Sequence, residues 1–186
     1  MPDRREVFES LYGAWRLAFL DQSGMRHFNL SFEGFWRSFF AAVLVAPAFA
    51  VLVAQKLAGR PGPLDLGWAA LVQALAYALS WAAFPLAAVV LTHLLGLSRN
   101  YVALIVALNW ATVLQVGAFL AAVAIELAAP GPLDGLILLL VTGAILFYQW
   151  FVTRAALQST GGVALMLVLV DLVLNTAINI SADHLM

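Results

Sequence analysis

The sequence predicts an all-α polytopic membrane protein, built as a five-transmembrane-helix bundle with an N-terminal amphipathic interfacial helix. Two observations support this fold class. The chain of 186 residues is 64% hydrophobic and 10% charged, whereas a soluble domain of this length needs far more charge on its surface. The charges are also unevenly placed: more than half of them precede Ser38, and long apolar stretches follow. Both features are typical of a chain that crosses a membrane several times.

Residues 1–34 are predicted to form a cytoplasmic amphipathic segment and a linker. Apolar side chains recur there at helical spacing, and they are Val7, Phe8, Leu11, Tyr12, Trp15 and Phe19. Charged residues, among them Arg5, Glu9 and Arg16, occupy much of the opposite face. Such a helix lies in the headgroup region of a bilayer, packs on its own bundle or binds a protein partner. The sequence leaves these three alternatives open.

Five apolar segments are long enough to cross a bilayer core about 30 Å thick, which needs roughly 20 helical residues. The predicted membrane domain, 35–180, contains spans at about 35–57, 66–95, 101–128, 133–152 and 161–180, and 181–186 form an external tail. The joints between spans carry Gly, Pro, Arg or Asn, which favour turns. Ser31 is the expected N-cap before the first span, and Glu33 lies in its first turn.

The pentapeptide PGPLD occurs twice, at Pro61–Asp65 and at Pro130–Asp134, and each copy precedes a span. Its glycine is expected to cap the helix, its second proline to occupy position N1, and its aspartate to lie at N3, near the positive end of the helix. We therefore interpret the motif as a repeated helix start. An ancient duplication of a two-span hairpin is the alternative.

The distribution of Lys and Arg predicts the orientation. Seven arginines fall on the side of the N-terminus, namely Arg4, Arg5, Arg16, Arg26, Arg37, Arg99 and Arg154. Lys56 and Arg60 fall on the opposite side. Because cytoplasmic loops carry the excess of positive charge, the N-terminus is predicted to be cytoplasmic and the C-terminus external. The net charge of −1 gives no basic surface for nucleic acid.

Polar side chains within the spans mark a candidate site, because an unpartnered polar group in hydrocarbon is costly. The fifth span places Asp171, Asn175 and Asn179 on one helical face, at i, i+4 and i+8. An ionised aspartate at the centre of a span costs roughly 2.5–3.5 kcal/mol on insertion scales. Asp171 must therefore face the bundle, be protonated or line a hydrated cavity.

Other spans offer polar partners for this face. The candidate set is completed by Gln73, Tyr77, Ser80, Asn109 and Thr112, with Gln115 further round the third span and Gln149 near the end of the fourth. Two interpretations are open for these groups. They form a proton or cation site with Asp171 as the titrating group, or they hold the helices together by hydrogen bonds.

Motifs for catalysis and metal binding are missing from the sequence. The chain has no cysteine, which excludes disulfides and thiol catalysis, and its three histidines are scattered. It contains no phosphate-binding loop, no G-x-S-x-G and no H-E-x-x-H. We therefore predict no enzymatic activity, no cofactor and no metal site.

Two stretches carry a resemblance to a known family. GLSRNYVALIVALNWATVLQ, residues 96–115, is similar to the turn that opens the third span in bacterial members of the Ypt-interacting-protein (Yip) family. YQWFVTRAALQSTGGVALMLVLVDLVL, residues 148–174, resembles the passage between their fourth and fifth spans. Five spans, the chain length and the N-terminal amphipathic segment also fit that family, over most of residues 35–180.

The resemblance implies a helical membrane scaffold, and in eukaryotic relatives it implies trafficking and small-GTPase partners. This chain lacks the long acidic cytoplasmic domain that serves those partners, so that function is not carried over. The expectation is instead a protein of the bacterial inner membrane. Our leading hypothesis is a non-enzymatic scaffold or accessory subunit that associates with another membrane protein or with itself. The alternative is a small transporter or channel component that uses the Asp171 face.

Overall fold

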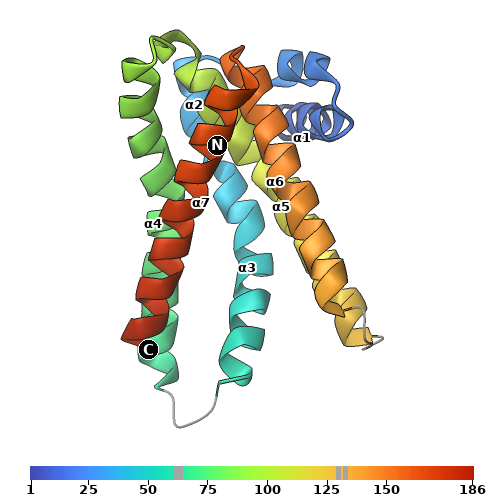
Figure 1. Cartoon of the computed structure of the whole chain (residues 1–186), viewed down its shortest axis with the longest axis vertical. Coiled ribbons are helices and arrows are strands. Elements are labelled where there is room, and N and C mark those ends of the chain that lie inside the picture. Colours follow the sequence, from blue (N-terminus) through green and yellow to red (C-terminus); the bar gives the residue numbers. More distant parts are fainter. Residues whose placement is uncertain (61–64, 129–130, 132–133) are drawn as a thin grey trace.

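The protein is helical throughout the part of the chain described by the structure, a computed structural model that covers residues 1–60, 65–128, 131 and 134–186 (Figure 1). The elements in chain order are α1 (Arg4–Ala18), η1 (Gln22–His27), α2 (Phe32–Ser38), α3 (Phe40–Ala58), α4 (Leu66–Leu94), η2 (Ser98–Asn100), α5 (Tyr101–Ala128), α6 (Asp134–Leu157) and α7 (Gly161–Leu185). Among the described residues, five stretches are long and apolar enough to cross a membrane, namely Phe32–Ala58, Leu66–Leu94, Ser98–Ala128, Gly135–Leu157 and Gly161–Leu185. The predicted fold class, an all-α membrane protein with five spans, is confirmed.

Two helices extend beyond their predicted ends. The fourth span was expected to end at residue 152, but α6 continues to Leu157, and the predicted tail 181–186 is helical as far as Leu185. A side chain from a distant segment binds the last carbonyl in each case. The amide of Asn100 donates to the Leu157 carbonyl over 2.7 Å, and the Trp68 indole donates to the Leu185 carbonyl over 2.7 Å. These bonds satisfy carbonyls that a helix end otherwise leaves unpaired.

The helix starts confirm one prediction and correct another. Ser31 is the N-cap of α2, and its hydroxyl oxygen accepts the Gly34 N–H over 3.0 Å. The prediction that Asp65 occupies N3 is wrong, because Asp65 is the N-cap of α4. In its extended backbone conformation the carboxylate reaches the N–H groups of Gly67 and Trp68, at 2.9 and 3.1 Å. An aspartate in this position is a strong cap.

The second copy of PGPLD is described in part. Helix α6 is described from Asp134 onwards, so the prediction that this residue occupies N3 stays a prediction. The predicted cap at residue 62 and the predicted N1 prolines at residues 63 and 132 lie outside the described residues. Whether the two copies reflect a duplication stays a prediction.

The bundle has two halves with different packing. At the end that carries α1 and α2 the helices lie close together, and we call this the packed half (Figure 1). Towards the other end they separate into three legs, formed by α4 with α7, by α3, and by α5 with α6; we call this the splayed half. The burial of helix α5 differs between the two halves. All residues from Leu104 to Ala111 are buried in the packed half, whereas beyond them only Ala122 of this helix is buried.

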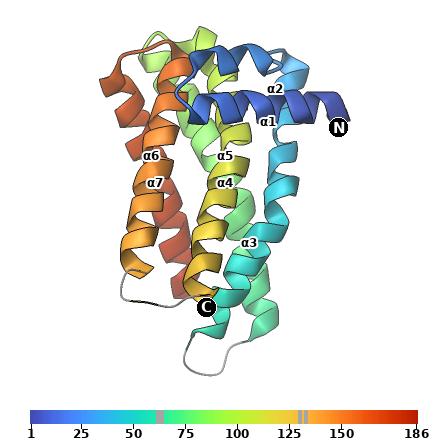
Figure 2. The same ribbon diagram turned by 90° about the vertical axis from the view of Figure 1, so that its right-hand side faces the viewer.

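Helix α1 lies across the packed half and not along the bundle (Figure 2). It packs on α5 and α6 through a face that includes Ser10, Ala14 and Leu17, all three fully buried. The buried Tyr148 hydroxyl of α6 donates to the Ala14 carbonyl over 2.8 Å. The first helix is therefore part of the protein core at this end.

Candidate functional site

A cavity of about 210 Å³ lies among α4, α5, α6 and α7, at the level where the packed half gives way to the splayed half. Polar and apolar side chains share its walls, which are formed by Ser80, Trp81, Phe84, Pro85, Ile105, Leu108, Asn109, Thr112, Gln115, Gln149, Asp171 and Asn175. Asp171 lies about 15 Å along α7 from Gly161, at 1.5 Å per residue. The cavity is therefore well inside the membrane-spanning part of the bundle.

The carboxylate of Asp171 is held by two amides. The Gln149 Nε2 group donates to Oδ2 over 2.5 Å, and the Asn175 Nδ2 group donates to Oδ1 over 2.8 Å. The same Asn175 amide is also 3.1 Å from the Asp171 backbone carbonyl. The ion pairs found in the described part of the chain involve other acids, and none includes Asp171. The carboxylate thus has hydrogen-bond donors on both oxygens but no protein cation beside it.

Five of the predicted polar residues meet at this cavity, namely Ser80, Asn109, Thr112, Asp171 and Asn175. The Asn109 amide also donates to the buried Ser38 hydroxyl over 2.9 Å, which ties α5 to the end of α2. The Thr112 hydroxyl donates to the Leu108 carbonyl of its own helix over 2.9 Å. Polar residues from four helices thus line one cavity, and whether they form a functional site or only hold the helices together stays a prediction.

Three of the predicted residues lie elsewhere. Gln73 is buried against the C-terminus, with its Nε2 atom 3.6 Å from the Met186 sulfur. The Tyr77 hydroxyl donates to the Ala42 carbonyl of α3 over 2.5 Å. Asn179 is exposed and donates to the Asn175 carbonyl over 2.8 Å. Helical spacing predicted one shared face for Gln73, Tyr77 and Ser80, but the three side chains have different surroundings: the C-terminus, α3 and the cavity.

Gln149 lies further inside its helix than the sequence predicted, since the prediction placed it near the end of the fourth span. Because α6 continues to Leu157, Gln149 lies about 12 Å inside the helix and reaches Asp171 directly. Sequence reasoning missed Trp81 and Phe84, which contribute aromatic rings to the wall. Aromatic residues in a span are common at lipid-facing and core positions, so the sequence carries no signal that singles out these two.

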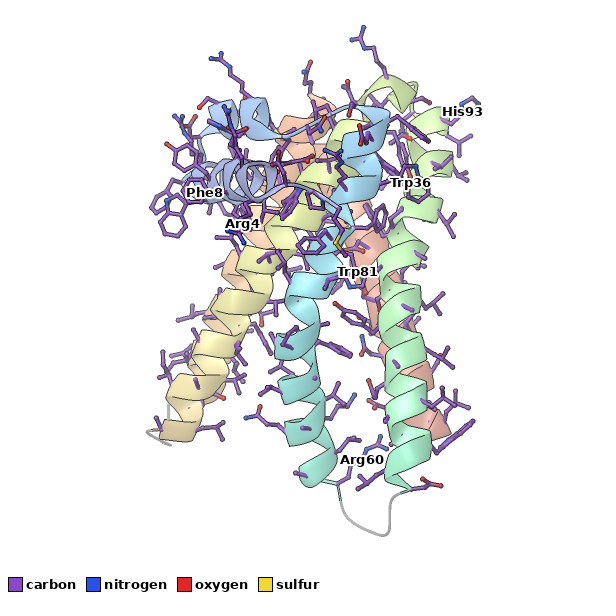
Figure 3. All side chains as sticks on the ribbon, turned by 180° about the vertical axis from the view of Figure 1, so that it is seen from behind. Arg4, Phe8, Trp36, Arg60, Trp81 and His93 are labelled. Atoms are coloured by element: carbon purple, nitrogen blue, oxygen red, sulfur yellow. The ribbon has the colours of Figure 1, made fainter. Side chains whose placement is uncertain are left out.

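The predicted interfacial set on α1 divides between two environments. Val7 and Leu11 are partly buried and pack against the core. The remaining members are exposed, namely Phe8, Tyr12, Trp15 and Phe19. Phe8 is 74% exposed at the outer side of the molecule, where α1 lies (Figure 3), and it lines a groove between α1 and α5. The helix therefore has one face in the bundle and a second, aromatic face that is free of protein contact over much of its area.

Comparison of the chain with known proteins finds no match among family models, curated proteins or solved structures.

Proposed function

We propose that this integral membrane protein is a component of a small transporter or channel, and that the Asp171 cavity is its intramembrane site for a proton or a cation. The observation that carries the proposal is the set of partners around the Asp171 carboxylate. It has an amide donor on each oxygen, at 2.5 and 2.8 Å, and no Lys, Arg or His partner in the described part of the chain.

The energetic argument concerns the charge that this carboxylate places in the membrane. Hydrogen bonds from Gln149 and Asn175 lower the cost of burying the charge but do not neutralise it. A bound proton or a bound cation removes the remaining cost. Intramembrane acids that face a polar cavity serve as ion and proton sites in many membrane proteins, which makes this assignment the natural one.

We infer the orientation from the positive charges. Arg4 lies at the packed end and Arg60 at the splayed end (Figure 3), as does Lys56 in the last turn of α3. Because most arginines belong to the N-terminal side, the packed half faces the cytoplasm. The aromatic face of α1, which includes Phe8 and Trp15, then lies in the cytoplasmic headgroup region, where rings of this kind are favoured. The inner membrane of a bacterium is the compartment that the Yip resemblance favours, and that resemblance stays a prediction.

A second candidate function is the scaffold or accessory subunit. It is favoured by the apolar side chains that the splayed half leaves exposed, such as Leu136, Leu139 and Leu140 on α6 and Val173 on α7. Lipid covers such faces in a monomer, and helices of a partner or of a second copy cover them in a complex. Recovery of a stoichiometric membrane-protein partner in mild detergent is the result that favours this function.

The test of the transport proposal is flux through the purified protein in liposomes, measured with pH-sensitive and cation-sensitive dyes. Asp171→Asn removes the charge and keeps the size of the side chain, so flux is expected to fall to the level of empty liposomes. Asn179→Ala is the matched control on the same helix, because Asn179 is exposed and outside the cavity. Unchanged flux in both Asp171→Asn and Asp171→Leu, or flux by no cation in the wild type, contradicts the proposal.

A further inference from the structure

We infer that the Asp171 cavity binds a small organic ammonium ion. This inference rests on the proposed function and deepens it, because it names one class of cation among those that an intramembrane carboxylate can attract. Three features of the cavity support this inference: its volume, the presence of aromatic as well as polar side chains in its walls, and the hydrogen bonds that two amides donate to Asp171.

The volume of about 210 Å³ suits an organic molecule. An engineered protein cavity of about 150 Å³ binds benzene, so this cavity has room for a compound somewhat larger than a benzene ring. A bare inorganic ion fills a small part of such a space. It would have to keep most of its water shell, and that shell gains nothing from the aromatic and aliphatic side chains of the wall.

The walls combine two kinds of side chain. Polar groups come from all four helices, with Asp171, Asn175 and Gln149 on α7 and α6, and Ser80, Asn109, Thr112 and Gln115 on α4 and α5. Trp81 and Phe84 on α4 supply aromatic rings. Trp81 lies on the inner side of α4, between that helix and α3 (Figure 3). A ligand with a cationic nitrogen and a carbon skeleton matches both kinds of side chain. Its nitrogen is attracted by the carboxylate and by the faces of the rings, and its carbon atoms are removed from water.

The hydrogen bonds at Asp171 favour an N–H donor over a metal ion. Both carboxylate oxygens already accept an amide N–H, at 2.5 and 2.8 Å, and each keeps a free lone-pair direction. An ammonium group can donate to those directions in a charge-assisted hydrogen bond. A hard metal ion instead requires about six oxygen ligands around it. The described residues contain no group of three or more His, Cys, Asp or Glu side chains that could hold a metal.

The charge of the cavity is defined by one residue. Among the described residues that line the cavity there is no Lys, Arg, His or Glu, and Asp171 is the one acidic side chain. A cationic ligand therefore meets no repulsive charge in the wall. A neutral ligand of the same shape loses the attraction to Asp171 and leaves that charge uncompensated.

The test compares two probes of nearly equal size, benzylammonium and benzyl alcohol, by isothermal titration into the full-length protein in nanodiscs. Saturable binding is expected for benzylammonium. We expect benzyl alcohol to bind about 10- to 100-fold more weakly, since it lacks the charge that pairs with the carboxylate. Sodium and potassium at millimolar concentration should not displace benzylammonium.

Variants separate the contributions of the two kinds of side chain in the cavity wall. Asp171→Asn should lower the affinity for benzylammonium by about 10- to 100-fold and make the two probes bind alike, whereas Asp171→Glu should retain the preference for the ammonium. Trp81→Leu should weaken ammonium binding by about 3- to 10-fold. Trp36→Leu is the control, because Trp36 is exposed on α2 and outside this cavity. A sharp thermal transition and a single size-exclusion peak must accompany each variant.

Several results overturn the inference. Equal affinity for the two probes, wild-type affinity in Asp171→Asn, or displacement by sodium each contradicts an ammonium site. Cation or proton flux that depends on Asp171, together with no binding of benzylammonium, refutes this inference but leaves the proposed function intact. Absence of both flux and binding in the wild-type protein refutes both.

Discussion

The packed and splayed halves consist of the same five spanning helices, yet they are held together differently. In the packed half, side chains such as Trp110 and Leu104 are fully buried, and polar groups bond across helices, as Asn109 does with Ser38. In the splayed half, the contacts between legs include the ion pairs of Lys56 and Arg60 with Asp183 and a hydrogen bond from Arg60 to the Asp183 carbonyl. Lipid tails are as apolar as leucine, so apolar composition alone does not bring helices together in a membrane. Close packing and polar contacts do, and the packed half is richer in both.

The cavity lies where the packed half and the splayed half meet. Ile105 and Leu108 close its wall from the packed half, while Asp171 and Asn175 continue along α7 towards the splayed half. A site in this position is fixed on one side by a rigid core and adjoins helices that have fewer protein neighbours. Four predictions test whether the contrast between the halves is real, beginning with the largest expected effect.

Truncation of a buried leucine in the packed half should cost most. Leu104 is 0% exposed, and Leu104→Ala is expected to lower the free energy of unfolding by about 2–4 kcal/mol because it leaves a cavity in close-packed surroundings. Leu127→Ala, on the same helix but 66% exposed in the splayed half, should cost less than about 1 kcal/mol. Reversible unfolding in mixed micelles measures both values. Equal losses would show that the halves are packed alike.

Glycine-to-alanine substitutions should have opposite signs in the two halves. A Cβ atom at Gly24 would lie 2.4 Å from the Gly13 carbonyl oxygen, so Gly24→Ala should destabilise the protein by about 1–3 kcal/mol. At Gly143, inside α6, a Cβ atom meets nothing within 4 Å, and Gly143→Ala should stabilise the helix by up to about 1 kcal/mol. Thermal unfolding in detergent gives the signs. A stable Gly24→Ala protein would refute close packing of α1 on η1.

Removal of the Tyr148 hydroxyl should loosen α1. Tyr148→Phe removes the side-chain donor that binds the buried Ala14 carbonyl, at an expected cost of about 1–2 kcal/mol. Hydrogen exchange of the α1 amides, followed by mass spectrometry, should become faster. Tyr12→Phe, which alters an exposed ring on α1 itself, is the control and should leave exchange unchanged. If both variants behave alike, the bond to Ala14 does not anchor the helix.

The smallest effect is expected at the ends of the legs. Asp183 accepts from Lys56 over 2.7 Å and from Arg60 over 3.2 Å, and all three side chains are partly exposed. Asp183→Asn should therefore cost less than about 1 kcal/mol, but it should broaden the distance between α3 and α7. Because the chain has no cysteine, spin labels at Gln55→Cys and Ile180→Cys can report that distance directly.

The control for this measurement is Glu9→Gln, which breaks an exposed ion pair with Arg5 at the packed end. It should leave the distribution between the two labels as it is in the wild type. An unchanged distribution in Asp183→Asn would mean that the ion pair does not restrain the legs.

The sequence was sufficient for the spans and for much of the polar site. Apolar length predicted five helices, and the i, i+4 spacing placed Asp171 and Asn175 on one face, where the structure brings them together. Helix ends were less predictable, since the bonds from Asn100 to Leu157 and from Trp68 to Leu185 depend on the tertiary fold.

The hydrogen bond between Gln149 and Asp171 could not be predicted from the sequence, because it also depends on the tertiary fold. Gln149 looked like a residue near a span end, and it became the direct partner of Asp171 once α6 extended beyond it. Asp65 was assigned to the first turn because acids are favoured there. Its role as the cap depends on the backbone conformation that precedes α4.

The most direct test of an Asp171 cation site is the reactivity of a single cysteine in its wall. Ser80→Cys, in membranes, should react with a cationic thiosulfonate reagent at least about tenfold faster than with an anionic one of similar size, because the carboxylate attracts the cation. This ratio should fall to about one when Asp171→Asn is added. Ser38→Cys, at a fully buried position, should not react with either reagent. A Ser80→Cys protein that is as inert as Ser38→Cys, or that reacts without regard to charge, would contradict the account.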